Sequence, residues 1–204
     1  IGETIVTWTV TDASGNFETC EQKFTIVDDI DPIINCPNSV VIDVDPGQCD
    51  AVFTYSVTGT DNCDLVLIPN QTAGFASGSV FPIGTTINTF IVTDPSGNTA
   101  ICSFNVTVID NEAPTVTCPA DISVTNDPGQ CGAVVSWTAP IPSDNCGIAS
   151  ITSSHNPGDT FPLGTTAVTY TVIDNANLQT LCSFDGEVTD TEAPSFTDLT
   201  PNIP

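Results

Sequence analysis

The feature that most constrains the fold of this chain is an internal repeat, in which a series of short motifs occurs twice at a nearly constant spacing. Cys36-Pro37 recurs as Cys118-Pro119, and the segment Asp45–Cys49 recurs as Asp127–Cys131. Self-similarity at a fixed period indicates a tandem array of similar folded units. Three further motifs return at nearly the same spacing: Asp61–Cys63 as Asp144–Cys146, Phe81–Thr86 as Phe161–Thr166, and Cys102–Phe104 as Cys182–Phe184.

The same register divides the chain into domains. Thr11–Asn16 matches Thr93–Asn98, and Asp190–Pro194 matches Asp110–Pro114. Methionine is absent, even at position 1, so we expect the chain to be a piece of a longer polypeptide. The predicted organisation is the C-terminal part of a preceding repeat over residues 1–27, complete repeats over 28–109 and 110–189, and the start of a following repeat over 190–204.

The charge of the chain is strongly one-sided. It holds 25 acidic side chains against a single lysine, which gives a formal net charge of −24. Nucleic-acid binding needs a basic surface, so this class is excluded, and an anionic membrane surface would repel the chain for the same reason. No apolar run approaches the ~18 residues that span a bilayer, so we expect no direct membrane insertion. The hydrophobic content of 40% is sufficient for a folded core.

The cysteines indicate the compartment. Nine are present, four in each complete repeat, and none has the close Cys/Cys or Cys/His spacing of a zinc site. Widely spaced cysteines in an acidic chain rich in turns are typical of disulfides, so we expect an extracellular or cell-surface protein. The ninth, Cys20, stands in the register of Cys102, and we expect its partner to precede residue 1.

The pattern within a repeat predicts β-strands. We expect strands over residues 40–44, 51–57, 86–93 and 99–109, the last two forming a hairpin around Gly97. On the last strand, Cys102, Phe104, Val106 and Val108 alternate with polar residues, which indicates one core face and one solvent face.

Aromatic residues recur at fixed positions of the repeat. Trp8, Phe90 and Tyr170 are equivalent, as are Tyr55 and Trp137, and a fixed position indicates core packing rather than ligand binding. A unit of ~80 residues with about seven short strands predicts an all-β fold of tandem immunoglobulin-like β-sandwich repeats. Because an odd number of strands places the two termini at opposite ends, we expect such units to join into an elongated rod.

The repeated motifs resemble those of the hyalin repeat (HYR) family over essentially the whole chain. Four cysteines per repeat, with Asn70–Gly74 before Ser77-Gly78, most resemble the repeats of large surface adhesins of gliding Bacteroidetes. One departure is Asp174–Leu178, which replaces the Asp-x-Ser-Gly-Asn turn of the first repeat. The resemblance implies an extracellular, immunoglobulin-like adhesion module that is not an enzyme.

The residue inventory also argues against catalysis. Serine nucleophiles need a base, and the single histidine, His155, precedes the turn signal Asn156–Gly158 and has no counterpart in the first repeat. We therefore predict no catalytic residue.

The acidic linkers between repeats are the main candidate for a ligand site. Loops that return to the linker end of a sandwich carry further acidic and amide side chains, and calcium takes six to eight oxygen ligands. An alternative is that Asp and Asn occur because turns favour them, with acidity serving solubility. The candidate calcium ligands are Asp28, Asp29, Asp31, Asp61, Asn62 and Asp94 at the first junction, Asp110, Asn111, Glu112, Asp144, Asn145 and Asp174 at the second, and Asp190 and Glu192 at the third.

The function predicted from these features is structural. We expect a stalk segment of a long secreted or cell-surface adhesin, whose disulfide-bonded repeats contact adjacent repeats of the same chain and are stiffened by calcium at their junctions. Polysaccharide or another surface ligand would then be bound through other domains. Two alternatives stay open: a binding module whose repeats themselves contact polysaccharide or protein, and a subunit of an extracellular filament.

Four cysteines in a repeat allow three disulfide pairings. The outer two are expected to pair because the first and last strands of such a sandwich are neighbours, and the resemblance to relatives that keep only those two implies that the inner two pair with each other. A straight strand over 51–57 would carry the chain about 23 Å away from Cys49, so the rival pairing Cys36–Cys63 with Cys49–Cys102 stays open. The favoured pairs are Cys36–Cys102, Cys49–Cys63, Cys118–Cys182 and Cys131–Cys146.

Overall fold

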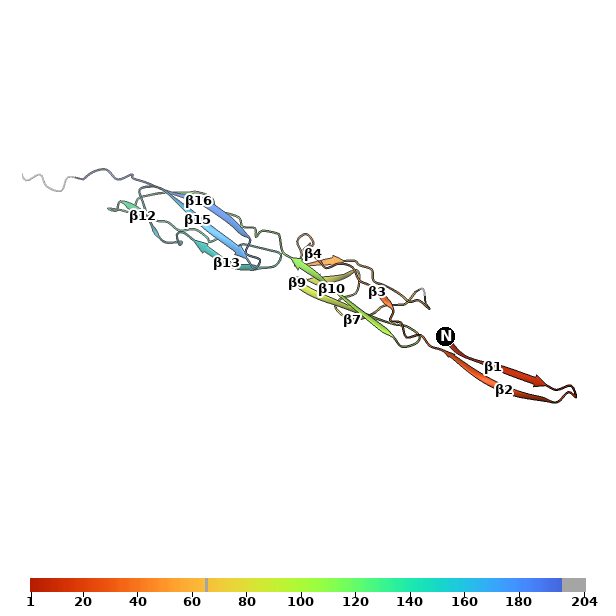
Figure 1. The fold of residues 1–204 in the computed structure, drawn as a ribbon. Coiled ribbons are helices and arrows are strands. Elements are labelled where there is room, and N and C mark those ends of the chain that lie inside the picture. Colours follow the sequence, from red (N-terminus) through yellow and green to blue (C-terminus); the bar gives the residue numbers. More distant parts are fainter. Residues whose placement is uncertain (65, 196–204) are drawn as a thin grey trace, which may run out of the picture. The chain divides into compact units, whose positions relative to one another are not determined.

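The computed structural model describes residues 1–64 and 66–195, all of whose regular elements are β-strands. Within this part of the chain there is no helix long and apolar enough to cross a membrane. The described residues form two compact units, and each has its own sheets (Figure 1). Unit 1 comprises Ile1–Ile42 and Asp50–Val108, whereas unit 2 comprises Asp43–Cys49 and the described residues from Ile109 onward.

Unit 1 begins with an isolated hairpin. Strands β1 (Gly2–Thr11) and β2 (Phe17–Ile26) pair antiparallel along their whole length. The carboxylate of Asp12 accepts hydrogen bonds from the backbone of Ser14 and Asn16, which closes the turn. Trp8, expected in a core, is 60% exposed because β1 and β2 are the only described strands of this sheet.

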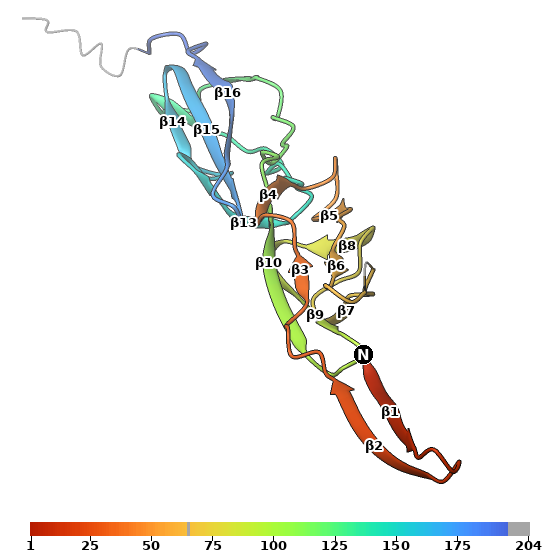
Figure 2. The same cartoon turned by 45° about the vertical axis from the view of Figure 1, so that its right-hand side comes forward.

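The first complete repeat is a β-sandwich, seen from two directions in Figures 1 and 2. A four-stranded sheet has the order β4-β10-β9-β7, and the pairs β5-β8 and β3-β6 form two smaller sheets. The predicted alternation on the last strand is confirmed, because Phe104, Val106 and Val108 are at most 2% exposed. The strands are β3 (Ile33–Asn35), β4 (Val40–Asp43), β5 (Asp50–Phe53), β6 (Thr58–Thr60), β7 (Asn70–Ala73), β8 (Ser79–Pro82), β9 (Gly84–Thr93) and β10 (Thr99–Ile109).

One predicted strand is shorter than expected. Residues 51–57 were predicted to form one strand, but β5 ends at Phe53. The reason is local, since the hydroxyl of Ser77 accepts a hydrogen bond from the backbone N–H of Tyr55 at 2.8 Å and donates to its carbonyl at 2.7 Å. A side chain thus occupies both backbone groups that would otherwise extend the ladder.

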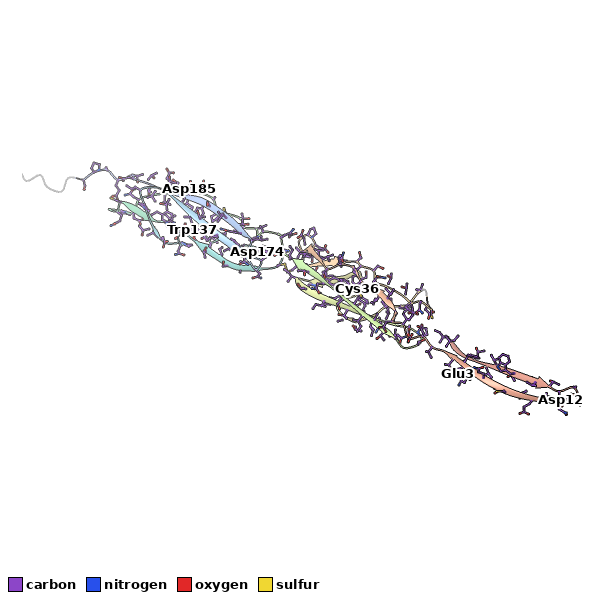
Figure 3. All side chains as sticks on the ribbon, viewed as in Figure 1. Glu3, Asp12, Cys36, Trp137, Asp174 and Asp185 are labelled. Carbon is purple, nitrogen blue, oxygen red and sulfur yellow. A yellow bond between two sulfur atoms is a disulfide. The ribbon has the colours of Figure 1, made fainter. Side chains whose placement is uncertain are left out.

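The second complete repeat is built in the same way. Its four-stranded sheet has the order β11-β16-β15-β13, and β12 pairs with β14. The core between the sheets includes Phe161, Val168, Tyr170 and Phe184, with Trp137 packed against it (Figure 3). Both repeats are therefore immunoglobulin-like β-sandwiches. The strands are β11 (Ile122–Thr125), β12 (Gly132–Val134), β13 (Ile148–Ser153), β14 (Thr160–Pro162), β15 (Gly164–Asp174) and β16 (Gln179–Thr189).

The final hairpin of each repeat turns through a residue with positive φ. In the first repeat this residue is Gly97, with φ +98°, as predicted. In the second repeat, where the turn sequence departs from the pattern, Asn177 adopts φ +68°. Asparagine tolerates the left-handed region better than most residues, so the turn is retained without glycine. The predicted following repeat is described only as far as residue 195, and residues 196–204 lie outside the described part of the chain.

Candidate metal centre and disulfide bridges

The linkers before the repeats share one local structure. In each, the carboxylate of the first aspartate accepts a hydrogen bond from the N–H two residues later, which bends the backbone. The distances are 3.3 Å from Ile30 to Asp28, 3.1 Å from Glu112 to Asp110 and 3.0 Å from Glu192 to Asp190. The aspartate is thereby fixed at the start of the linker.

Three aspartates converge in the second repeat. Asp110 comes from the linker and Asp144 from the loop before β13, and Asp174, which is labelled in Figure 3, comes from the end of β15. One oxygen of each lies within 4.8 Å of the others. The linker itself is held by buried Pro114, whose carbonyl accepts a hydrogen bond from Thr180 on β16.

Each of these carboxylates uses one oxygen for the backbone and leaves the other without a donor. Asp110 Oδ1 accepts from Glu112 N–H, and the Oδ1 atoms of Asp144 and Asp174 accept from the N–H groups of Cys146 and Leu178, both at 2.8 Å. The buried oxygens of this region that find no hydrogen-bond partner among the described residues are Asp110 Oδ2, Asp144 Oδ2, Asp174 Oδ2 and Asn145 Oδ1.

The burial of these oxygens makes their lack of partners informative. Asp174 is fully buried and Asp110 is 8% exposed. Buried carboxylates without compensation are unfavourable, because both desolvation and mutual repulsion oppose them. Four hard oxygen atoms with up to three negative charges match the ligand preference of Ca²⁺, and water and backbone carbonyls can supply the remaining positions. The donor set therefore fits a calcium ion.

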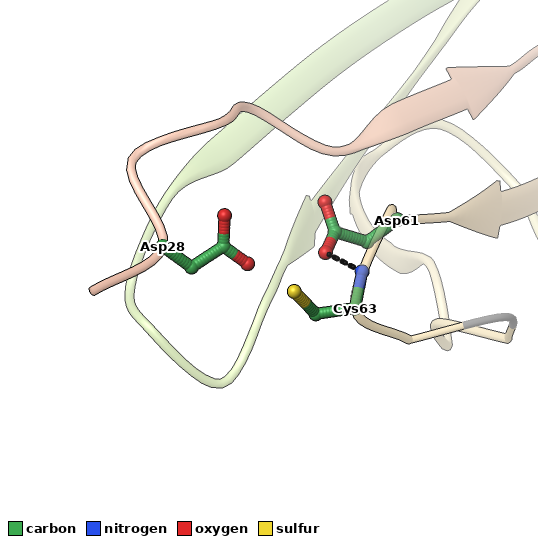
Figure 4. Close-up of side chains that lie close together, drawn as sticks. All are labelled: Asp28, Asp61 and Cys63. Carbon is green, nitrogen blue, oxygen red and sulfur yellow. Dashed lines mark hydrogen bonds between the residues drawn. The ribbon is translucent and has the colours of Figure 1, made fainter. Parts of the chain in front are cut away.

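The corresponding cluster of the first repeat differs. Asp28, Asp61 and Cys63 place a ligand atom each within 4.8 Å of one another (Figure 4). Asp94, which stands in the register of Asp174, is outside this cluster. Its two oxygens accept hydrogen bonds from the backbone and side-chain amide of Asn98, at 2.8 and 2.7 Å. In the second repeat Leu178 replaces Asn98, and a leucine side chain has no donor for Asp174.

The pKa shifts of Asp94 and Cys63 agree with this difference. Burial alone would raise the pKa of Asp94, but hydrogen bonds from Asn98, Gly97 and Ser96 lower it below the ordinary value. At Cys63, a hydrogen bond to the Asp28 carboxylate raises the pKa of the thiol, and burial and the two nearby aspartate charges act in the same direction. A thiol binds metal as the thiolate, so the first cluster is the poorer metal site.

The other predicted ligands lie elsewhere. Asp29 and Asp31 are exposed and belong to neither cluster, and the side chains of Asn62 and Asn111 are also exposed. Asp190 is engaged in the turn of its own linker. The two linker glutamates bind backbone instead: Glu112 accepts from the N–H of Gly47 at 3.0 and 3.2 Å, and Glu192 accepts from Gly129 at 2.9 and 3.0 Å. This repeated contact was not predicted from the sequence, although both glutamates and both glycines recur in register.

The outer cysteines of each repeat are bonded as expected. Cys36 bonds to Cys102 and Cys118 to Cys182, with Cα–Cα distances of 6.0 and 5.5 Å.

The inner pairing predicted from the resemblance, Cys49–Cys63 and Cys131–Cys146, differs from the structure. Cys49 bonds to Cys146, in the following repeat, at a Cα–Cα distance of 4.8 Å. The reason is that Gly47 and Gln48, beside Cys49, are hydrogen-bonded to Glu112 and Asn145, whereas Cys63 lies beside Asp28. Cys20, Cys63 and Cys131 are exposed and unbonded.

His155 and most aromatic residues contribute to packing. The ring of His155 packs edge-on against Phe161 with centroids 5.2 Å apart, and its Nδ1 lies 3.1 Å from the hydroxyl of Ser154. Phe90 and Tyr170, which were expected in the core, are 7% and 4% exposed.

Comparison with known proteins identifies the family. Residues 27–108 and 109–188 match the HYR domain. The chain is 39% identical over 207 residues to hyalin of Strongylocentrotus purpuratus and 37% identical over 185 residues to hyalin of Lytechinus variegatus. These matches cover 96% and 85% of this chain but only 17% and 34% of the two hyalins.

Other matches are more distant. The chain is 36% identical over 156 residues to the sushi, von Willebrand factor type A, EGF and pentraxin domain-containing protein 1 of Rattus norvegicus, covering 74% of this chain and 4% of that protein. Among solved structures, protocadherin gammaB7 EC3-6 is 14% identical with a TM-score of 0.37, and the match covers 92% of this chain and 58% of that one. The disulfides and the curated relatives indicate a protein outside the cell or at its surface. The chain belongs to the HYR domain family.

Proposed function

We propose that this chain is a stalk segment of a long extracellular adhesin, in which disulfide-bonded repeats act as spacers and have no enzymatic role. The observation that carries the proposal is the use of the aromatic side chains. Within the described part of the two complete repeats, Phe75 is the single aromatic among the large hydrophobic residues that are exposed, at 42%. A repeat that binds ligand by itself would be expected to present more of them. The proposal includes the narrower resemblance described above: we propose that the adhesin is similar to the large surface adhesins of gliding Bacteroidetes.

A domain exchange tests the spacer role. In the full-length protein, residues 28–189 would be replaced by two HYR repeats of Strongylocentrotus purpuratus hyalin, which keep the fold but change most surface side chains. We expect surface attachment of cells or beads that carry the protein to be retained. Loss of attachment with normal secretion would contradict the spacer role and favour a binding module.

One observation favours the binding module as a second candidate. Val66 and Ile68 are 81% and 89% exposed, and they line a hollow of about 360 Å³ together with residues 57–60, Leu67 and Pro69. The double variant Val66→Ser with Ile68→Ser keeps the backbone and removes this apolar surface. Under the stalk proposal attachment is unchanged, whereas a binding module would lose it.

The proposal includes calcium bound by Asp110, Asp144, Asn145 and Asp174. Its support is the convergence of the three aspartates, together with four buried oxygens of these residues and Asn145 that lack donors among the described residues. An ion bound there would join the linker, the loop before β13 and the end of β15, and so fix the start of the repeat onto its sandwich. Calcium would supply charge compensation and no catalytic chemistry.

Calorimetric titration of Ca²⁺ into the chelator-treated chain tests this site. We expect saturable binding and a higher unfolding temperature, since a ligand at 100 times its Kd stabilises the folded state by about 2.7 kcal/mol. Asp174→Asn should weaken binding, and Glu187→Gln, an exposed acid on β16, is the matched control. Leu178→Asn should also weaken binding, because the new amide would donate to Asp174 as Asn98 does to Asp94. The absence of both heat and thermal stabilisation would exclude the site.

A further inference from the structure

The Cys49–Cys146 disulfide joins two different positions of the repeat. The equivalent of Cys49 in the second repeat is Cys131, and the equivalent of Cys146 in the first repeat is Cys63. The bond therefore runs from the first inner cysteine of one repeat to the second inner cysteine of the next. Of the three unbonded cysteines, Cys131 has the repeat position of Cys49 and Cys63 has the repeat position of Cys146.

The contacts around the bond explain how Cys49 is held there. Glu112 accepts two hydrogen bonds from Gly47 N–H, and the side-chain amide of Asn145 donates to the Gln48 carbonyl at 2.7 Å. Both contacts involve neighbours of the bonded cysteines. A hollow of about 310 Å³ beside them is lined by Gly47, the linker residues Glu112, Ala113 and Thr115, and residues 143–145.

The same arrangement recurs at Cys131. Glu192 accepts two hydrogen bonds from Gly129 N–H, at 2.9 and 3.0 Å. A hollow of about 300 Å³ is lined by Gly129, Cys131 and the linker residues Asp190 and Glu192–Ser195. At the Cys49 junction, the corresponding hollow is also lined by the loop that precedes Cys146. The first inner cysteine and its linker glutamate are thus arranged alike at both junctions.

Cys63 has surroundings similar to those of Cys146, its equivalent in the second repeat, which is bonded to Cys49. It lies beside Asp28 and Asp61 (Figure 4), and their equivalents Asp110 and Asp144 belong to the cluster next to Cys146. One difference is that Ile30 stands where Glu112 stands in the second linker, so this junction lacks the glutamate contact. The contacts therefore support a bridge at Cys131 more strongly than one at Cys63.

We propose that successive repeats of this protein are joined by disulfides, with Cys131 bonded to the Cys63-type cysteine of a following repeat and Cys63 bonded to the Cys49-type cysteine of a preceding one. The partner in each case is a neighbouring HYR repeat of the same polypeptide. These disulfides between repeats go beyond the proposed stalk role, and the test of them does not depend on whether calcium binds.

Each bridge forms by thiol–disulfide exchange with a disulfide oxidant, either a small-molecule disulfide or an oxidoreductase. The thiolate of Cys131 attacks one sulfur of the oxidant, and the other sulfur leaves as a thiolate. The thiolate of the partner cysteine then attacks the mixed disulfide at the Cys131 sulfur and releases the second oxidant thiolate. Two protein thiols lose two protons and two electrons, and the oxidant disulfide is reduced to two thiols.

A register-matched extension of the chain tests the proposal. Residues 1–194 followed directly by residues 33–204 keep Glu192 after the second repeat and place Cys131 of the first copy one repeat before Cys63 of the second copy. The protein would be expressed in an oxidising compartment, alkylated without reduction and mapped by mass spectrometry of its peptides. We expect a peptide that links those two cysteines, with alkylation confined to Cys20 and Cys63 of the first copy and Cys131 of the second.

Three outcomes would overturn the proposal. They are alkylation of Cys131 in the first copy and Cys63 in the second, recovery of Cys49–Cys63 peptides, and disulfide-linked dimers of the extended chain. The variant Cys131→Ser in the first copy is the matched control. It leaves the Cys49–Cys146 bonds intact, and Cys63 of the second copy should be the one cysteine alkylated in addition to those alkylated without the substitution.

Discussion

At the scale of single residues, the two complete repeats bury different aromatic pairs at the same two positions. Tyr55 and Phe90 of the first repeat are replaced by Trp137 and Tyr170 in the second. The Tyr55 hydroxyl donates to the carbonyl of Phe75 at 2.6 Å, whereas the Trp137 indole N–H donates to the Tyr170 hydroxyl at 2.7 Å. Each polar group has a partner, so either pair is compatible with the same core.

Gly186 allows close packing of the second core, and we predict that Gly186→Ala destabilises it. A Cβ at this position would lie 2.6 Å from Cε2 of Phe161, which is fully buried and has no space to move. Overpacking of this kind costs about 1–3 kcal/mol. Thermal unfolding followed by circular dichroism would measure it, with Glu187→Ala on the exposed face of β16 as the control. Equal unfolding temperatures of the two variants would contradict the prediction.

Asp94 makes stability depend on pH in a predictable direction. Its pKa is lowered in the folded state, since hydrogen bonds from Asn98, Gly97 and Ser96 outweigh burial. The ionised form is therefore favoured by folding. The associated stability is present above the unfolded pKa of about 3.9 and is lost as pH falls through the lower folded value. Between pH 6 and pH 3, the unfolding temperature of the wild type should fall further than that of Asp94→Asn. An equal fall in the unfolding temperatures of the wild type and Asp94→Asn would show that the Asp94 carboxylate contributes nothing to the pH dependence of stability.

At the scale of elements, the outer disulfides anchor the long hairpin strands. Cys182 on β16 is 3% exposed, and its bond to Cys118 closes a loop of 64 residues. We predict that Cys118→Ala with Cys182→Ala destabilises the second repeat by about 2–5 kcal/mol. Urea unfolding would measure the loss. Cys20→Ala, which removes an exposed and unbonded thiol, should leave the midpoint unchanged, and a similar shift in both variants would exclude the bond as the cause.

The strands that sequence could predict are those with long, uninterrupted alternation. The final strand over residues 99–109 was predicted correctly because its apolar residues alternate along the whole length. The strand over 51–57 was overestimated, because its early end depends on the hydroxyl of Ser77, which is distant in the sequence. Short strands such as β3 and β6 carry too few residues for a period to be recognised.

The acidic clusters were foreseen in part. The topology of a sandwich was enough to group Asp144 and Asp174 with the linker that contains Asp110, and the structure brings these three together. The exclusion of Asp94 could not be foreseen, because it depends on one amide of Asn98. The Cys49–Cys146 bond was missed because each repeat was treated as closed. The repeat period of the sequence does not show whether a cysteine bonds to its partner within the same repeat or to the equivalent partner in the next repeat.

At the scale of the whole molecule, the net charge of −24 opposes folding through self-repulsion. The ion pair between Lys23 and Glu3 offsets little, because both side chains are 55% exposed. We predict that, with chelator present, the unfolding temperature rises by a few degrees between about 10 mM and about 500 mM NaCl as the charges are screened. A flat or falling dependence would show that repulsion does not limit stability.

The two outer disulfides determine how the span from Cys36 to Cys182 responds to mechanical tension. The bonded spans run from residue 36 to 102, from 49 to 146 and from 118 to 182, so they form one continuous covalent path. Between Cys36 and Cys182 the shortest route crosses two bridges and the stretch of backbone from Cys102 to Cys118. That stretch, fully extended, measures about 55 Å, against about 500 Å for the unbridged chain. Tension applied between Cys36 and Cys182 is therefore carried by the bridges and this stretch, so the span acts as a nearly inextensible tether until its bridges are reduced, whereas the β1-β2 hairpin lies outside it.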